Sequence, residues 1–323
     1  MKKARSFTAK VVTRMVLALL WPLPAAAQQG WVPLPREKRC PSAWGATDER
    51  GAANLQTPEM VLKATRLIRT GRMFELGKIL DADMPKFGPR QFSLFTAPTT
   101  SPTGRGQERG NEELVVSELG QIGTQVDALA HITIANELYN CFDNDKTMTR
   151  RGFSHLGVER IGTVFTRGVM LDIAALKGLD VLPDRYEITV ADLQGAMARQ
   201  GGIEIGKGDF VAIRTGWGRL WGTQKDKFAR EEPGVGVAAA EWLVARQVMM
   251  IGSDNWGIDV FPHPDDLRFP VHQVTLVSAG VYLLENLELE ELAKERIYEF
   301  AFVLQPLKMR GATGSTVAPT AIR

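Results

Sequence analysis

Short apolar segments alternate with helix-like segments along most of the chain. Runs of β-branched and aliphatic residues predict strands over 164–173, 209–215, 247–252, 280–284 and 300–307. These runs are mostly apolar at consecutive positions, so both faces of each strand should be covered. The pattern therefore predicts an α/β protein whose sheet is buried, not a meander with one face in solvent.

Two of the intervening helices have clear start and stop signals. Thr57-Pro58 begins an apolar spacing of helical period, and Gly71 ends it. Thr189 and Asp192 have the spacing of a capping box, and the helix that they open stops before Gly201. Both signals place helices between the predicted strands, as an α/β chain requires.

The segment 86–113 has no periodicity. It is rich in Pro, Gly, Ser, Thr and Arg, which are residues typical of turns. We predict a long loop or lid there, because loops of this length inside a compact domain usually have a function.

The N-terminus has the composition of a secretory signal peptide. Basic residues precede the apolar run 15–24, which is followed by Ala25-Ala26-Ala27. We predict a signal peptide over 1–27, a single domain over 28–323, and a periplasmic or secreted protein with no membrane association after processing. The alternative, a buried N-terminal helix, would have to accommodate Pro22 and Pro24.

Charge and cysteine content narrow the classes of function. The formal net charge of +2 is small, which argues against a nucleic-acid-binding surface. Cys40 and Cys141 are the only cysteines. In an oxidising compartment they could form a disulfide, and two free or buried thiols remain the alternative.

Polar residues interrupt the apolar pattern at two distant places. Gln121, Gln125 and Asp127 are separated by even steps, so an extended backbone would turn all three to one side. The solvent face of an edge strand would give the same alternation. The second place favours a site: His272 precedes an apolar run, predicted as a strand, that ends in Glu285. A glutamate is seldom buried unless it is paired or bound to a metal.

These residues resemble the cyclase family, which includes the kynurenine formamidase-like hydrolases. The family hallmark is His-x-Gly-Thr-His-x-Asp-x-Pro-x-His, and other blocks of the chain match in order and spacing. The corresponding positions here are Gln121-x-Gly123-Thr124-Gln125-x-Asp127-x-Leu129-x-His131.

The resemblance implies a fold and a set of functional residues. The fold would be the swivelling β/β/α type, in which helices wrap a small barrel-like sheet, assembled as a homodimer or homotetramer. His131 would transfer protons, and Trp44 would line the substrate pocket, although a core tryptophan is the alternative. The metal ligands would be Gln121, Gln125, Asp127, His272 and Glu285.

The two glutamines depart from the family pattern and bear on the metal. An amide oxygen is a harder and weaker ligand than an imidazole, so zinc affinity should fall. We therefore expect a divalent ion, with Mn²⁺ favoured over Zn²⁺ or Mg²⁺.

The predicted function is hydrolysis of an amide, lactam or lactone bond in a small molecule, as in an arylformamidase. The competing hypothesis is an exported binding protein that kept the fold and lost catalysis when the ligands became glutamines. Turns explain Asp254, Trp256 and Asp259 about as well as a site does, and Asp172 could orient site groups or simply end its strand. Structural roles are favoured for four other residues: packing for Trp217 and Trp221, a surface loop for His263 and a structural contact for His155.

Overall fold

The computed structural model describes residues 1, 30–99 and 105–323. The predicted signal peptide falls almost entirely outside these residues. Val32–Arg323 form one compact unit. Within the described part of the chain, no helix is long and apolar enough to cross a membrane.

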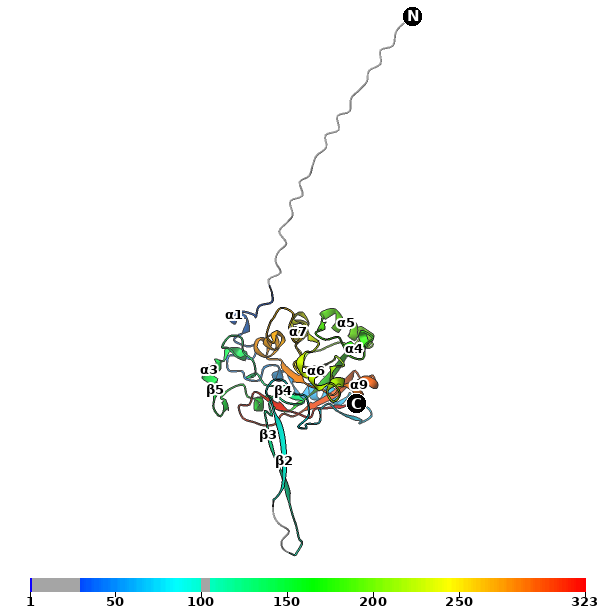
Figure 1. Cartoon of the computed structure of the whole chain (residues 1–323). Helices are drawn as coiled ribbons and strands as arrows, with labels where there is room; N and C mark the ends of the chain where they lie inside the picture. Colours follow the sequence, from blue (N-terminus) through cyan, green and yellow to red (C-terminus); the bar gives the residue numbers. More distant parts are fainter. Residues whose placement is uncertain (2–29, 100–104) are drawn as a thin grey trace. The chain divides into compact units, whose positions relative to one another are not determined.

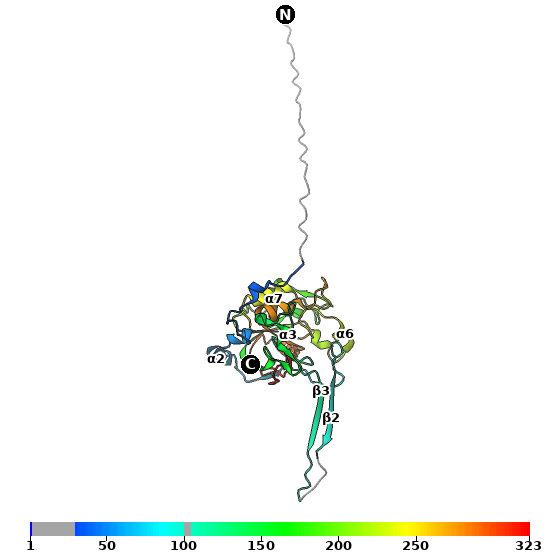
Figure 2. The ribbon, with the colours of Figure 1, turned by 90° about the vertical axis from the view of Figure 1, so that its left-hand side faces the viewer.

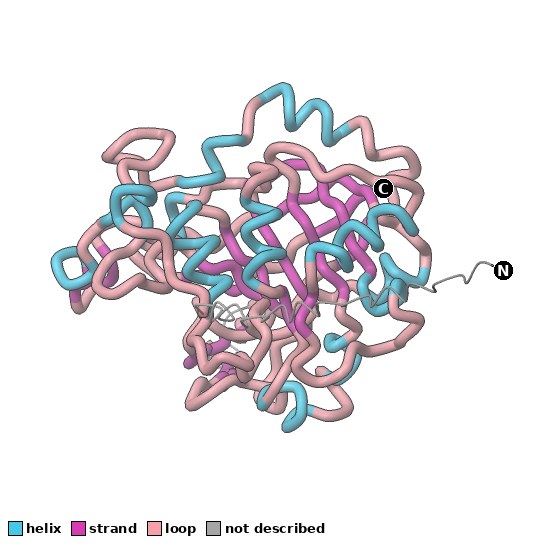
Figure 3. The backbone as a smooth tube through the Cα atoms, turned by 90° about the horizontal axis from the view of Figure 1, so that it is seen from above, coloured by secondary structure: helices cyan, strands magenta, loops and turns pink. Residues whose placement is uncertain are grey.

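The centre of this unit is a mixed sheet that curls into a half-barrel, as the fold prediction requires (Figures 1 and 3). β7, β9, β11 and β12 run parallel in its middle, and antiparallel strands flank them. In spatial order the strands are β1 (Met73–Glu75), β15 (Thr320–Ile322), β13 (Glu299–Leu304), β7 (Val164–Asp172), β9 (Phe210–Arg214), β11 (Met250–Ser253), β12 (Tyr282–Glu285), β4 (Gln125–Asp127) and β14 (Gly314–Thr316).

Short helices surround the sheet (Figure 3). α2 packs against β7 and β13, α4 packs against β9, and α5 packs against β7. The α-helices are α1 (Arg36–Arg39), α2 (Pro58–Thr65), α3 (Asn144–Thr147), α4 (Ile173–Leu176), α5 (Val190–Arg199), α6 (Lys225–Arg230), α7 (Val237–Val244), α8 (Pro270–His272) and α9 (Glu290–Lys294). Other short helical turns are η1 (Gly51–Leu55), η2 (Tyr139–Cys141), η3 (Val158–Arg160), η4 (Trp217–Leu220) and η5 (Gln273–Ala279).

The start signals of the two helices are confirmed, but α2 ends at Thr65, six residues before the predicted stop at Gly71. The Thr57 hydroxyl accepts a hydrogen bond from the backbone N–H of Met60 at the start of α2. Thr189 and Asp192 form a complete capping box at the start of α5. Both caps satisfy backbone N–H groups that the first helical turn leaves free. The predicted strands are also present, as β7, β9, β11, β12 and β13.

The predicted loop over 86–113 is in part a β-hairpin, which corrects the prediction. β2 (Phe92–Pro98) and β3 (Asn111–Ser117) pair antiparallel, and the ribbon extends away from the sheet (Figures 1 and 2). Two other short pairs lie outside the main sheet: β5 (Met148–Thr149) with β6 (Gly152–Phe153), and β8 (Glu187–Ile188) with β10 (Gly234–Val235).

The apolar run between His272 and Glu285 is also different from the prediction. Residues 273–279 continue α8 as the wider helical turns of η5, and only residues 282–285 form a strand. The central residues of η5, Val274 to Val277, are buried. Periodicity cannot separate such a helix from a buried strand.

Cys40 and Cys141 form a disulfide, with their Cα atoms 5.9 Å apart. The bond joins the segment after α1 to η2. Hydrogen bonds reinforce the same junction, since the Asn140 side chain accepts from Ser42 N and donates to Gly45 O. These contacts fasten the segment after α1 to η2.

Candidate active site

The site lies where the carboxyl ends of the parallel strands meet the start of β4. Because β4 runs antiparallel to β12, Gln125 at the start of β4 lies opposite Glu285 at the end of β12. Crevices at this end of parallel strands are the usual ligand sites of α/β sheets. β4 is flanked by β12 and β14, so it is not the solvent-faced edge strand that the alternation also allowed.

A tight turn precedes β4 and fixes its entry. Gly123 has φ +63°, and a Cβ there would lie 2.1 Å from a methyl group of Leu80. The positive φ favours glycine at this position, and a larger residue would also displace the Leu80 side chain. Asn286 holds the turn to the end of β12, because its side chain donates to Gly123 O and its backbone oxygen accepts from the Thr124 hydroxyl.

His272 reaches the same point from the end of α8. Its Nδ1 lies 2.6 Å from Asp259 Oδ2, and Asp259 also accepts from the backbone N–H groups of Val271 and His272. A carboxylate accepts hydrogen bonds only, so Nδ1 carries a proton. Asp259 thus fixes the ring and leaves Nε2 to face the site.

Two buried carboxylates converge on that Nε2 atom. It lies 3.5 Å from Asp127 Oδ2 and 3.4 Å from Glu285 Oε1. The side chains of Asp127, His272 and Glu285 are nearly inaccessible to solvent. Two carboxylates and an imidazole nitrogen packed this closely require a cation among them, either a proton on His272 or a metal ion.

Buried oxygen atoms without hydrogen-bond partners favour a metal ion at this place. Among the described residues, Asp127 Oδ2 and Gln125 Oε1 are buried without a hydrogen-bond partner. Buried polar atoms nearly always have one, so each needs an explanation. A divalent cation bound by Asp127, His272 and Glu285, with Gln125 within the same group, is an explanation that fits these donors.

The pKa shifts of these groups in the metal-free protein also indicate a site for a cation. Burial opposes a charge on His272, yet Asp127, Asp259 and Glu285 raise its pKa well above the usual value. Burial and the neighbouring Asp127 raise the pKa of Glu285 to about 7. Burial would also raise the pKa of Asp127, but His131 and His272 hold it below its ordinary value. The cluster is therefore built to hold positive charge.

His131 lies beside this cluster. Its Nδ1 is 3.1 Å from Gln121 Nε2, and its Nε2 is 4.0 Å from Asp127 Oδ1. Burial lowers the pKa of His131, although the Asp127 carboxylate acts in the opposite direction. Judged by the proximity of nitrogen and oxygen atoms alone, Asp127, His131 and His272 could also hold a metal. Geometry thus leaves two ligand sets, which differ in whether His131 or Glu285 takes part.

The predicted ligands Gln121 and Gln125 have different surroundings. Gln125 Nε2 donates to Glu285 Oε2 over 2.6 Å and leaves its oxygen free. The oxygen of Gln121 instead faces Arg90 Nη2 at 3.4 Å and Gln125 Nε2 at 3.3 Å. Both side chains belong to the site, and whether either binds metal stays a prediction.

A cavity of about 140 Å³ opens onto these groups. Part of its wall is aromatic: the rings of Phe87 and Trp256 stack with centroids 4.0 Å apart. The guanidinium of Arg90 lies 5.6 Å from the Phe87 ring centroid. Its lining residues are Phe87, Arg90, Gln121, His131, Ile132, Trp256, Gly257, Phe269, His272 and Glu285.

Sequence reasoning missed several of these lining residues. Phe87 and Arg90 come from the segment read as a loop, and Phe269 from the loop before α8. The prediction of a long loop or lid over 86–113 was the signal nearest to Phe87 and Arg90, because it gave that segment a function. Asp259 and Trp256 were considered, but turn formation explained them equally well.

Trp44 lies elsewhere in this chain. It is 39 % exposed and lines a separate cavity with Tyr139 and Ala52. It does not line the cavity at His131. Its role in substrate binding stays a prediction.

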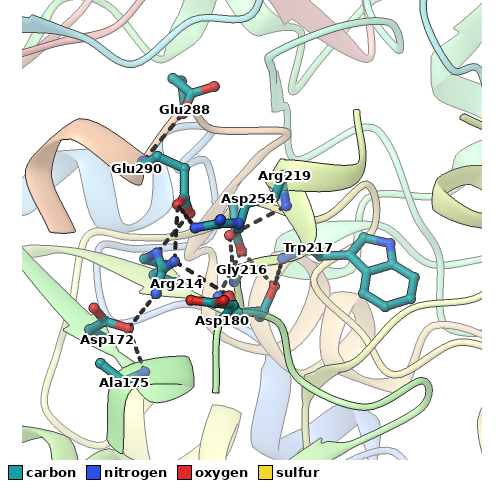
Figure 4. Close-up of polar contacts among 12 residues, drawn as sticks. Asp172, Ala175, Asp180, Arg214, Gly216, Trp217, Arg219, Asp254, Glu288 and Glu290 are labelled. Atoms are coloured by element: carbon teal, nitrogen blue, oxygen red, sulfur yellow. Dashed lines mark hydrogen bonds and ion pairs between the residues drawn. The ribbon is translucent and has the colours of Figure 1, made fainter. Parts of the chain in front are cut away.

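Asp254 and Asp172 hold the backbone at the ends of β9 and β7 (Figure 4). Asp254 accepts hydrogen bonds from Thr215 N, the Thr215 hydroxyl and Gly216 N, which secures the turn after β9. Asp172 pairs with Arg214 and caps α4. In the described chain neither residue lines the cavity at His131.

The remaining candidates outside the cluster have structural surroundings. Trp217 is fully buried in a cluster with Phe228 and Trp256, and Trp221 packs against that cluster. His155 lies 3.1 Å from Glu49. His263 accepts a hydrogen bond from Asp265 N.

The cyclase family model matches residues 74–260, more than half of the chain. The chain belongs to the cyclase family. A crystal structure described as a novel cyclase is 34 % identical to it, with a TM-score of 0.82 over 90 % of this chain and 100 % of that one. No curated protein matches this cyclase-family chain.

More distant structures share the fold. The isatin hydrolase A of Ralstonia solanacearum is 22 % identical, with a TM-score of 0.55 over 78 % of this chain and 92 % of that chain. The isatin hydrolase A of Labrenzia aggregata, solved with benzyl benzoate bound, is 21 % identical, with a TM-score of 0.56 over 77 % of this chain and 93 % of that chain. These matches agree with the α/β cyclase-like architecture of the sheet and its helices.

Proposed function

We propose that this cyclase-family protein is a metal-dependent hydrolase of amide, lactam or lactone bonds in small aromatic molecules. The observation that carries the proposal is the convergence of His272 Nε2, Asp127 Oδ2 and Glu285 Oε1 within 3.5 Å, beside an aromatic cavity. The distant isatin hydrolases, named for an activity of this kind, support it.

Asp127, His272 and Glu285 would hold the ion, with Gln125 as a further oxygen donor. When bound, a divalent ion lowers the pKa of a bound water and polarises a carbonyl group. Asp259 keeps His272 in the tautomer that can bind a metal. Because the donors include more oxygens than nitrogens, we expect Mn²⁺ to serve better than Zn²⁺ or Mg²⁺.

The cavity wall supports an aromatic substrate. Phe87 and Trp256 offer ring faces, and a cavity of 140 Å³ suits a single small ring system. Arg90 would pair with the carboxylate that hydrolysis of an amide or lactone produces. The sequence expectation assigns the proton transfer to His131, which stands at the wall between the cluster and the cavity.

Metal rescue and a substrate panel test the proposal. The purified protein is stripped with a chelator, reloaded with Mn²⁺, Zn²⁺ or Mg²⁺, and assayed on formanilides, isatin-like lactams and aryl lactones. We expect turnover that depends on metal and returns best with Mn²⁺. Absence of both metal and turnover would instead favour the exported binding protein. Equal or better rescue by Zn²⁺ would argue against amide oxygens as ligands.

The proposal includes export. The Cys40–Cys141 disulfide supports a periplasmic or secreted location, because such bonds persist in oxidising compartments. Sequencing the N-terminus of protein recovered from the host envelope should give a start near Gln28. An intact Met1 in a soluble cytoplasmic pool would contradict it.

A further inference from the structure

The amide of Gln121 joins two pairs of partners. Its Nε2 lies 3.1 Å from Asp127 Oδ1 and 3.1 Å from His131 Nδ1. Its Oε1 lies 3.4 Å from Arg90 Nη2 and 3.3 Å from Gln125 Nε2. Both amide hydrogens and the oxygen are thus engaged within the protein.

The chemistry of these partners determines where the oxygen and the NH₂ group of the Gln121 side chain lie. The Asp127 carboxylate can only accept a hydrogen bond, so it must face the NH₂ group. The Arg90 guanidinium can only donate, so it must face the oxygen. An amide flip would set oxygen against the carboxylate and NH₂ against the guanidinium. The orientation of Gln121 therefore follows from its partners at both ends.

The same orientation decides the state of His131. With one hydrogen of Gln121 Nε2 directed at Asp127, the other is directed at His131 Nδ1, and that nitrogen must have a lone pair. An imidazolium would place N–H against N–H, so the contact also disfavours a charged ring. A neutral imidazole with a bare Nδ1 carries its proton on Nε2.

We propose that Gln121 is a positioning residue that holds His131 as the neutral Nε2–H tautomer, so that His131 donates a hydrogen bond to the substrate. The inference rests on the proposed hydrolase and changes the part that His131 has in it. A protonated Nε2 cannot bind a metal ion, which favours Glu285 over His131 in the ligand set. Nor can it take a proton from water.

The free hydrogen of Nε2 has a natural acceptor in the substrate. Asp127 Oδ1, at 4.0 Å, is too far for a hydrogen bond. His131 lines the cavity, so its N–H would meet the carbonyl oxygen of the scissile bond. A fixed donor at that place stabilises the oxyanion that develops as the bond is attacked. His131 would then be a hydrogen-bond donor to the reacting group, and Gln121 the residue that keeps it so.

The tautomer can be measured without metal or turnover. Protein labelled with ¹⁵N-histidine is stripped of metal, and long-range ¹H–¹⁵N correlation spectra are recorded at neutral pH. The chain has four histidines, and the spectrum of His131→Ala identifies the signals of His131 by their absence. We expect Nδ1 to resonate as an unprotonated nitrogen and Nε2 as a protonated one. A protonated Nδ1 in the wild type would overturn the inference.

The variant Gln121→Glu tests whether Gln121 sets the tautomer of His131. A carboxylate accepts where the amide donates, so Nδ1 of His131 should become protonated. Gln107→Glu adds the same charge at an exposed position and should leave the His131 signals unchanged. Unchanged signals in a folded Gln121→Glu protein would show that Gln121 does not set the tautomer. If that variant does not fold, the wild-type spectrum alone decides. Failure of the proposed function would appear in the substrate panel and not in these spectra.

Discussion

At the scale of single residues, the site depends on which side chains bind and which only orient. Asp127, His272 and Glu285 present lone pairs to one point, whereas Asp259 and Gln121 have their polar atoms engaged with neighbours. This difference decides what each substitution should do. Removing a ligand should empty the site, and removing an orienting residue should weaken it.

Asp259→Asn tests the orienting role at His272. The variant keeps the shape of the side chain but loses the charge that holds Nδ1–H, so metal affinity should fall by about 10–100-fold. Metal titration of the stripped protein measures it. Asp265→Asn, an exposed change in the same loop, is the matched control. Equal affinity in the two variants would mean that Asp259 has no influence on the ligand.

The variant His131→Ala tests whether His131 is a metal ligand or a hydrogen-bond donor to the substrate. Loss of one hydrogen-bond donor to the reacting oxygen should lower kcat by about 10²–10³-fold. Bound metal should remain, while Asp127→Ala should lose it. Metal content and kcat are measured on the same preparations. Loss of metal in His131→Ala would make His131 a ligand, and near-normal kcat would remove it from the mechanism.

At the scale of elements, the sequence predicted what periodicity and capping control. The strands β7 and β9 and the cap of α5 follow from local pattern, and so does the placement of Gln125 and Asp127 on one strand. Gln121, predicted on the same face of an extended segment, lies instead in the bend before β4. The pattern did not distinguish the helical run 273–279 from a strand, because a largely buried helix and a buried strand have similar composition.

The same limit explains the residues missed in the site. Phe87 and Arg90 lie in a segment without period, so no local rule says where they point. Their place beside Gln121 and Trp256 is set by contacts with elements far away in the sequence. The role of Asp259, a candidate from the sequence, could be assigned only once the position of His272 was known.

The β2–β3 hairpin exposes apolar side chains that could contact a second copy of the chain. The cross-strand pair Leu94 and Val115 is exposed on one face. The next pair, Phe95 and Leu114, is exposed on the other, because neighbouring residues of a strand alternate in direction. A two-stranded ribbon is marginally stable alone, so apolar side chains on both faces favour cover by a second copy of the chain.

We therefore expect a homodimer or homotetramer that depends on this ribbon. Phe95→Asp with Leu114→Asp should shift the protein to a smaller species, because two charges would be buried in the contact. Light scattering coupled to size exclusion measures the mass. Thr96→Asp with Glu112→Asp alters exposed polar positions of the same ribbon and is the control. A wild-type monomer, or an unchanged mass in the first variant, would contradict the expectation.

At the scale of the whole molecule, the N-terminal segment is attached to the body by a small set of links. The disulfide joins two cysteines that are 101 residues apart in the sequence. Tyr139 adds a hydrogen bond from its hydroxyl to Asp48, beside those of Asn140. The site lies on other elements, so this junction should affect stability more than chemistry.

Replacing both cysteines tests that separation. In the variant Cys40→Ala with Cys141→Ala, the unfolded chain regains the freedom that the cross-link removes, and the free energy of unfolding should fall by about 2–4 kcal/mol. Guanidinium unfolding of the variant and of the oxidised wild type measures the difference. The hydrogen bonds of Asn140 and Tyr139 remain, so the folded variant should still bind metal with the wild-type affinity. The reduced wild type is the control, and it should match the variant. Equal stability of the oxidised and reduced proteins would show that the link contributes nothing, and loss of metal binding would show that the junction reaches the site.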